Sequence, residues 1–598
     1  MNSTLRLRPA SLVAAAVAIV LAQNAVAQEE PTALGEITVT ARKRAESLQD
    51  VPFAISARTG ENLQAVGAQN IEDVSRNVAG LSVQNLGPGQ SQVGLRGISA
   101  GKTDRDLPGV KEQVGVYMDE SVISLSLFTP DLDLYDLNRV EVLRGPQGTL
   151  FGSGSLAGTV RYISNQPDLS DGYGDFEVGI NTISDGGDGG FIRSMFNVPL
   201  GDRAALRVVG YFNELPGFID AHGPDGSLDQ NVNDGERQGG RLSLRWELTD
   251  SIVITPRVIY QDIDVNGYNR QDEFNILANP FTTTQPRVNI RDREQYRQLD
   301  EHFDDDFFLG DLTMEFDFGP AVLTSVSSYT DRDILVTRDA SQLTGSVTFD
   351  ILGEVDGVRL DSPLLDYTTV EVFTQELRLS SDTDGRFQWL IGGFFSDIQR
   401  DYGQTLPTPG YDALIGVPSP AVGSPPDTPF FSRIPYDFEQ KAAFAEVSLD
   451  ITERFAATLG ARYYDFTEER DLYFGGLFAD SDGLPTEPSN GPGESDDDGV
   501  LPRVLFAYDV SDSVQLNAQA SEGFRLGGIN DPLNQGLCSP EDLITFGGRD
   551  SFESESLWNY ELGAKIGFAG GRGQFNVAAF HSEIDDLQMP VVAGTCSS

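Results

Sequence analysis

Regular alternation of apolar and polar residues is the feature of this sequence that most constrains its fold. From about residue 172 onward, stretches of roughly ten residues alternate in this way, which is typical of β-strands with two different faces. In residues 241–248, Leu242, Leu244, Trp246 and Leu248 face one side, and Arg241, Ser243, Arg245 and Glu247 face the other. Residues 455–464 and 556–568 repeat the pattern. These strands are therefore predicted to have one apolar and one wet surface.

The lengths of the connections alternate as well. Tight turns are predicted near residues 201, 250, 319, 384, 453, 511 and 570, with long polar segments between them at about 214–236, 265–304, 335–367, 403–436, 468–497 and 526–555. Short turns at one end and long loops at the other are typical of an outer-membrane β-barrel. A soluble β-sandwich or propeller, the alternative, does not sort its loops in this way. We therefore predict an all-β transmembrane barrel over residues 171–598.

The number of strands is unusual for such a barrel. About fifteen can be counted between residues 174 and 588. Bacterial single-chain barrels have an even number of strands, and an open edge in lipid would leave backbone groups without partners. We therefore expect further strands after Ser598, so that the barrel is incomplete at the C-terminus.

The first residues predict export. Arg6 and Arg8 precede an apolar run at residues 12–21, and an A-x-A cleavage site ends at Ala27, so residues 1–27 are a predicted signal peptide. The formal net charge of -49 excludes nucleic acid as a partner, because both molecules would be negative. We explain the excess of acidic residues by solubility or by a saline habitat. The alternative explanation is that acidic loops hold divalent cations. The acidic runs 304–306 and 496–498 are expected in solvated loops.

No catalytic constellation is visible in the sequence. His222, His302 and His581 are far apart, and we predict no enzyme activity, no metal site and no cofactor. Cys538 and Cys596 fall in neighbouring long loops. In an oxidising exterior we expect a disulfide between them, with two unpaired thiols as the alternative.

Residues 48–170 follow a different pattern from the predicted barrel. Short strand runs and two helical patterns, at residues 60–68 and 70–78, indicate a small α+β domain. Within it, residues 140–167 are rich in glycine and proline. Their spacing does not fit a phosphate-binding loop, because no G-K-[ST] follows the glycines.

Four stretches resemble the TonB-dependent receptors. Residues 35–56 (GEITVTARKRAESLQDVPFAIS) are similar to the TonB box and its lead into the plug domain, and residues 140–167 to the most characteristic plug segment. Residues 521–530 and 557–565 resemble strand motifs of the late barrel. The resemblance implies a 22-stranded barrel in the outer membrane of a Gram-negative cell, with the plug, residues 48–170, in its lumen. In this family the glycine-rich segment folds the four-stranded core of the plug tightly.

The resemblance also implies an energy-coupling segment. Residues 28–47 would form a linker that contains the TonB box, which comprises Glu36, Ile37, Thr38, Val39, Thr40 and Ala41. TonB, energised with ExbB and ExbD in the inner membrane, would pair with this box as an added β-strand, for which a free edge is needed. Outer-membrane lipid and lipopolysaccharide are the other expected partners.

Charged contacts between plug and barrel are implied as well. Arg96 and Arg144 match plug arginines that contact glutamates on the barrel wall, and Glu561 matches one of those glutamates. Glu141 is expected in the same set of contacts. Such pairs would hold the plug by modest energies in a partly wet lumen. The alternative is that both arginines pack only within the plug.

The expected function is energy-coupled uptake of a large, scarce solute. A ferric siderophore is the first expectation, and glycan fragments or a cobalamin-like vitamin are the alternatives. From a different class, a passive porin or a non-functional truncated barrel also fits the pattern of strands. The sequence does not identify the solute.

Overall fold

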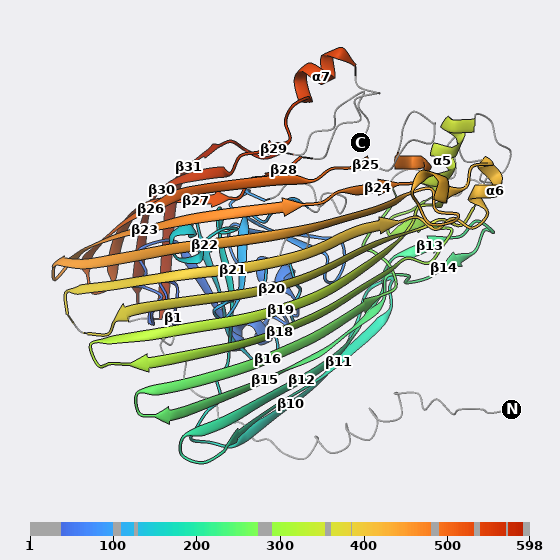
Figure 1. Cartoon of the computed structure of the whole chain (residues 1–598). Coiled ribbons are helices and arrows are strands. Elements are labelled where there is room, and N and C mark those ends of the chain that lie inside the picture. Colours follow the sequence, from blue (N-terminus) through green and yellow to red (C-terminus); the bar gives the residue numbers. More distant parts are fainter. Residues whose placement is uncertain are drawn as a thin grey trace, which may run out of the picture.

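One large antiparallel sheet dominates the computed structural model, which describes residues 37–99, 109–124, 129–272, 290–352, 360–383, 385–479, 489–530, 539–569 and 572–589. The sheet has 17 strands in the described residues and curves like a trough around the N-terminal domain (Figure 1). Two strands are short, β24 (Tyr473–Gly475) and β25 (Ser489–Asn490). The other fifteen are β10 (Tyr173–Thr182), β11 (Asp188–Pro199), β12 (Ala204–Leu215), β15 (Gly235–Thr249), β16 (Ile252–Val265), β18 (His302–Asp317), β19 (Ala321–Asp339), β20 (Pro363–Ser381), β21 (Phe387–Thr405), β22 (Phe431–Thr452), β23 (Phe455–Arg470), β26 (Gly493–Ser511), β27 (Val514–Arg525), β30 (Glu555–Phe568) and β31 (Gly573–Asp585).

The connections are distributed as the sequence predicts. Each predicted tight turn lies between two consecutive long strands, at one end of the sheet (Figure 1). The long connections at the other end contain β13 (Asp220–His222), β14 (Leu228–Asp229), β17 (Glu294–Tyr296), α5 (Ser341–Leu352), α6 (Tyr411–Ile415), η2 (Ser419–Val422), η3 (Leu477–Ala479), β28 (Gly528–Ile529), α7 (Pro540–Phe546) and β29 (Ser551–Phe552). The acidic runs 304–306 and 496–498 lie inside β18 and β26, so their prediction as loops is wrong.

The two faces of the sheet differ as the alternation predicts. On β15, Leu242 and Trp246 are 46% and 44% exposed, whereas Arg241 and Ser243 are 7% and 3% exposed. The apolar side chains point outward and the polar ones point into the lumen, where the N-terminal domain covers them. Among the described residues, no helix combines the length and apolar composition that crossing a membrane requires.

The plug domain is built around a five-stranded sheet, one strand more than expected from the family resemblance. The strand order is β3 (Ile55–Thr59), β8 (Leu137–Arg144), β9 (Gly158–Ser164), β6 (Val114–Met118) and β7 (Ser121–Val122). The helices α2 (Gly60–Ala65) and α3 (Ile71–Ser75) and the hairpin β4 (Leu81–Asn85)–β5 (Ser91–Leu95) pack against it.

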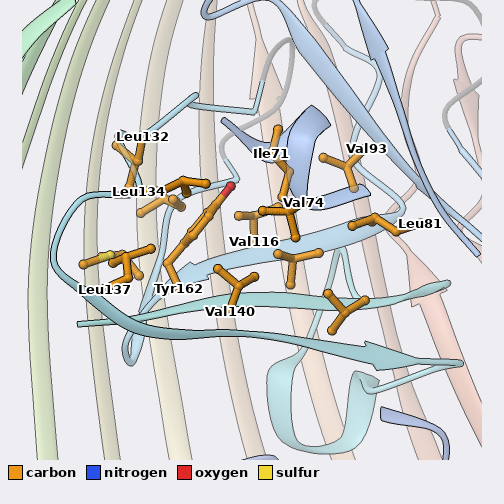
Figure 2. Packing of buried hydrophobic residues seen from close by; sticks show 14 of the residues in the cluster. Ile71, Val74, Leu81, Val93, Val116, Leu132, Leu134, Leu137, Val140 and Tyr162 are labelled. Carbon is orange, nitrogen blue, oxygen red and sulfur yellow. The ribbon is translucent and has the colours of Figure 1, made fainter. Parts of the chain in front are cut away.

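The core of the plug continues into the barrel wall. Ile71, Val74, Val140 and Tyr162 are at most 1% exposed and pack together (Figure 2). Three barrel residues, Ile259, Phe307 and Leu309, belong to the same buried cluster. Plug and barrel therefore share one apolar core on this side.

Two glycines explain why residues 140–167 turn so sharply. Gly158, which starts β9, has φ +151°, and a Cβ atom there would lie 2.3 Å from the Leu143 carbonyl oxygen. Gly152, which ends α4 (Gly148–Phe151), has φ +77° and lies against the side chain of Arg462 on the barrel wall. Only glycine adopts these conformations at such close distances without strain.

Candidate functional site

The segment that resembles a TonB box is folded into the plug. Thr38–Val39 (β1) pair antiparallel with Glu46–Ser47 (β2), and the Leu48 amide donates to the Ile37 carbonyl oxygen at 2.8 Å. Val39 and Ala41 have no exposed surface and join an apolar cluster of the plug and barrel. In this state β1 is therefore buried and has a strand partner on one edge, and its expected pairing with TonB stays a prediction. Glu36 lies outside the described residues.

Polar contacts fix the middle of this segment. The Thr40 amide donates to Glu141 Oε1 at 2.9 Å, and Arg161 Nη1 donates to the Thr40 carbonyl oxygen at 2.8 Å. Arg161 and Glu141 are themselves paired at 3.0 Å, and both are at most 1% exposed. Glu141, which was expected at the plug–barrel contact, thus lies within the plug and holds the N-terminal segment.

A second set of charges links the same segment to the barrel. Lys43 Nζ donates to Glu120 at 2.8 Å, and the same carboxylate accepts from Arg161 and from Arg378 on β20, both at 2.9 Å. Burial by itself would raise the pKa of Glu120, but Arg378, Lys43 and Arg161 outweigh it and hold that pKa well below its usual range. Glu120 therefore connects the N-terminal segment, the plug and the barrel wall.

Arg96 and Glu561, both expected at the plug–barrel contact, are brought together. Arg96 forms an ion pair with Glu561 on β30, and their side chains are 6% and 0% exposed. The second oxygen of Glu561 accepts from the Ala54 amide at 2.9 Å. Arg144, in contrast, donates to Ser56 within the plug. Burial and the nearby charge of Arg96 lower the pKa of Arg144.

On one side of the lumen, barrel arginines bind plug carboxylates. The carboxylates lie in plug residues 119–136, and their partners are spread over strands β11 to β20. The pairs are Arg193–Asp133 (3.2 Å), Arg207–Asp136 (2.5 Å), Arg237–Asp131 (2.5 Å), Arg241–Asp136 (2.9 Å), Arg257–Asp119 and Arg378–Glu120 (2.9 Å). These side chains are largely buried, so each charge depends on its partner.

On the opposite side, the polarity is reversed and the pairs are fewer. Besides Glu561, the barrel offers Glu468 on β23, which binds Lys111 of the plug at 2.5 Å. Burial lowers the pKa of Lys111, and Glu468 opposes that shift. Glu555 on β30 accepts from the amide of Gln113 at 3.0 Å. This side therefore uses barrel carboxylates and plug donors.

The plug carboxylates and most of their barrel partners were not predicted from the sequence. Residues 129–137 read TPDLDLYDL, and this alternation places Asp131 and Asp133 opposite Leu132 and Leu134, which lie in the plug core. The period of two could have identified these carboxylates as facing the barrel wall. Their arginine partners lie far away in the sequence, and no local pattern identifies them.

The described residues contain one group that could hold a metal ion. Ligand atoms of Asp264, His302 and Asp304 lie within 4.8 Å of one another on β16 and β18, near the end with the long loops. These side chains are exposed or half-buried, and His302 Nε2 contacts Asp304 at 2.9 Å. Cys538 and Cys596 lie outside the described residues, so their expected disulfide stays a prediction.

Comparison with known families decides the identity. A family model described as TonB dependent receptor-like, beta-barrel, matches residues 245–598, and a model of the TonB-dependent receptor plug domain matches residues 47–159. The chain belongs to the TonB-dependent receptor family. Members of this family are receptors of the outer membrane that work with TonB, and the outward apolar face of the sheet fits that location.

The relatives support the same assignment. The pesticin receptor of Yersinia pestis is 23% identical over 94% of this chain and 72% of its own length. The ferripyoverdine receptor of Pseudomonas aeruginosa is 27% identical, but the aligned part is 38% of this chain and 25% of that protein. The solved ferric yersiniabactin uptake receptor of Yersinia pestis has a TM-score of 0.70 at 18% identity, and covers 90% of this chain and 73% of that one. That similarity shows a shared fold.

Proposed function

We propose that this receptor imports a ferric siderophore across the outer membrane with energy supplied through TonB. The observation that carries the proposal is the folded segment at residues 37–43, which contacts both the plug and the barrel and is held by Glu141, Arg161 and Glu120. A protein that pulls on this segment would act on plug and wall together. The names of the relatives, which refer to ferripyoverdine and yersiniabactin, favour a ferric siderophore as the solute.

The proposal includes partners that complete the energy coupling. TonB would bind residues 36–41 by strand addition after they leave the plug, and ExbB and ExbD would energise TonB in the inner membrane. Lipid and lipopolysaccharide would cover the outward apolar face. We further propose that the chain acts as a transporter and not as an enzyme, because its buried carboxylates serve as partners of plug and barrel cations.

Uptake of iron tests this proposal. Cells that have this protein as their sole siderophore receptor would be given radioactive iron as a set of ferric siderophores. We expect uptake that is lost when residues 36–41 are deleted or when TonB is absent, whereas binding at the cell surface is retained. Uptake that persists without TonB would instead indicate a passive porin. Uptake of a glycan or of a cobalamin in place of iron would move the assignment to those solutes.

A further inference from the structure

Two buried arginines face the plug where it offers no carboxylate. Arg462 on β23 and Arg503 on β26 are 2% and 1% exposed. β23 and β26 are adjacent, and Arg503 lies opposite Gly460. The two arginines are therefore diagonal neighbours on the lumen face, with Cα atoms about 7–8 Å apart.

Arg503 lacks hydrogen-bond partners in the described residues. None of its three guanidinium nitrogens has a partner, and the nearest carboxylate oxygen, Glu446 Oε2, is 3.8 Å away. That oxygen has no hydrogen-bond partner either. The guanidinium instead packs over the ring of Phe53 in the plug, 4.7 Å from its centroid. A buried guanidinium normally binds a carboxylate through two parallel hydrogen bonds, so this environment is unusual.

Arg462 has a similar environment. Its guanidinium lies 5.3 Å and 5.4 Å from the ring centroids of Phe394 and Phe444, and its Nε has no hydrogen-bond partner. On the plug side it meets Gly152, where a Cβ atom would lie 2.9 Å from its Nη2. No ion pair involves Arg462 within the described part of the chain.

Near these two arginines, positive charges outnumber the carboxylates that are free to pair with them. Plug residues 142–167, which include Gly152, contain no aspartate or glutamate. The other carboxylates that act on the two arginines have partners of their own, since Glu376 is bonded to Arg378, Glu46 to Arg42 and Glu561 to Arg96. Glu446 alone remains for two guanidinium groups. A buried charge without a partner is costly, so two buried arginines that share one carboxylate leave a positive charge that calls for a counter-ion.

We propose that Arg462 and Arg503 form a binding site for anionic groups of the solute on its way through the lumen. The site would take carboxylate, phenolate or catecholate oxygens, which match the planar donor array of arginine. Phe53 and the plug segment at Gly152 cover both arginines in the present structure. The solute would therefore reach them only after the plug has moved, so the site serves passage and not first binding.

This inference rests on the proposed function and can be tested with chelates of different charge. The probes are radioactive iron as an anionic ferric tris-catecholate and as a neutral ferric tris-hydroxamate, given to cells with this receptor alone. We expect the double variant Arg462→Gln/Arg503→Gln to lower uptake of the anionic chelate about tenfold or more, with surface affinity unchanged. Uptake of the neutral chelate should stay at its wild-type rate.

Two further variants keep the result interpretable. Arg462→Lys/Arg503→Lys retains both charges and should restore a large part of the uptake of the anionic chelate. Arg433→Gln removes a barrel arginine that pairs with Asp401 at 2.9 Å, where both side chains are exposed, and should have no effect. The amount of each receptor in the outer membrane is measured by immunoblot, so that loss of folding is recognised.

The outcomes separate the two proposals. Equal loss for both chelates, or no loss for the anionic one, would overturn the anion site and leave the proposed function intact. Import of only the neutral chelate by the wild-type receptor would likewise overturn the anion site and leave the proposed function intact. A wild-type receptor that imports neither chelate nor any other ferric siderophore would overturn the proposed function, and the anion site with it.

Discussion

The two sides of the lumen wall hold the plug in different ways. Both sides share apolar clusters with the plug, but on the side formed by β11 to β20 six barrel arginines also pair with plug carboxylates. On the side formed by β22 to β30, the plug forms two ion pairs with the wall, Arg96–Glu561 and Lys111–Glu468. Among the described residues, the wall arginines Arg462 and Arg503 on this side have no plug carboxylate as a partner.

This difference follows from where the plug carries its carboxylates. Residues 119–136 contain five acidic residues that bind the wall, whereas residues 142–167 contain none. The acidic segment is therefore anchored by ion pairs. The glycine-rich segment has no ion pair to the described part of the wall, and Leu150 and Phe151 attach it through an apolar cluster that includes Phe444. We expect the plug to separate from the wall first on the side of the glycine-rich segment.

The largest effect is expected for Asp136→Asn. Asp136 binds both Arg207 and Arg241, and it has φ +59°, which asparagine tolerates, so the substitution removes the charge without adding backbone strain. Two buried guanidinium groups would lose their carboxylate, which should reduce the free energy of unfolding of the plug by about 3–5 kcal/mol. Hydrogen exchange of the amides in β8 and β9 measures this change.

The matched substitution on the other side is Glu446→Gln. Its Oε2 lies 3.8 Å from Arg503 without a hydrogen bond, whereas Asp136 is bonded to two arginines, so we expect a smaller loss of about 1–3 kcal/mol. Similar losses for Asp136→Asn and Glu446→Gln would contradict the division of the wall into an anchored and a loosely held side.

A smaller effect is expected for Arg161→Gln, which acts on the N-terminal segment. The substitution removes the bonds from Arg161 to Thr40, to Glu141 and to Glu120. Hydrogen bonds of charged groups contribute about 1.5–3 kcal/mol. The equilibrium constant for opening of the segment should therefore rise about tenfold or more. Labelling of Val39→Cys, in a background without Cys538 and Cys596, reports the opening.

The control for this experiment lies in the barrel. Arg241→Gln also removes a buried arginine. Its partner Asp136 belongs to the anchored side of the plug and has no hydrogen bond or ion pair with Thr40 among the described residues. Labelling of Val39→Cys should therefore stay at the wild-type rate. Equal acceleration by both substitutions would show that the segment responds to general loosening of the plug.

A pH effect is expected at Glu120. Because Arg378, Lys43 and Arg161 outweigh burial and lower its pKa in the folded state, its contribution is complete above the pKa of the released carboxyl, about 4.3, and is lost as the pH falls below that value. Attachment of the N-terminal segment should thus be constant from pH 8 to about 5 and weaken at lower pH. A spin label on Ser47→Cys measures the mobility of the segment. Release between pH 7 and 5 would contradict this assignment, and Glu120→Gln should abolish the transition.

The sequence was informative about the barrel because a strand's environment repeats every two residues. The alternation at Arg241 and Leu242 places these side chains on the lumen and lipid faces, and the loop lengths order the strands. The pair Arg96–Glu561 was accessible only through the family resemblance, since 465 residues separate its members.

Other features could not be predicted from local pattern. The burial of Val39 and Ala41 depends on tertiary contacts with Phe53 and other cluster members, which the extended, β-branched segment does not reveal. The position of Glu141 within the plug depends on Arg161 across β8 and β9. A short β-branched run fits both a free strand and a buried one, so only the packing decides between them.

The smallest effect is expected for an ion pair outside the lumen. Arg203 and Asp250 pair across two short turns, and their side chains are 54% and 90% exposed. Exposed pairs contribute about 0–1 kcal/mol because water and salt screen them, so Asp250→Ala should leave urea unfolding nearly unchanged at any salt concentration. Asp136→Asn removes the same kind of charge from a buried pair. If the two substitutions destabilised the receptor equally, the number of ion pairs, and not their burial against the plug, would set the strength of the anchored side.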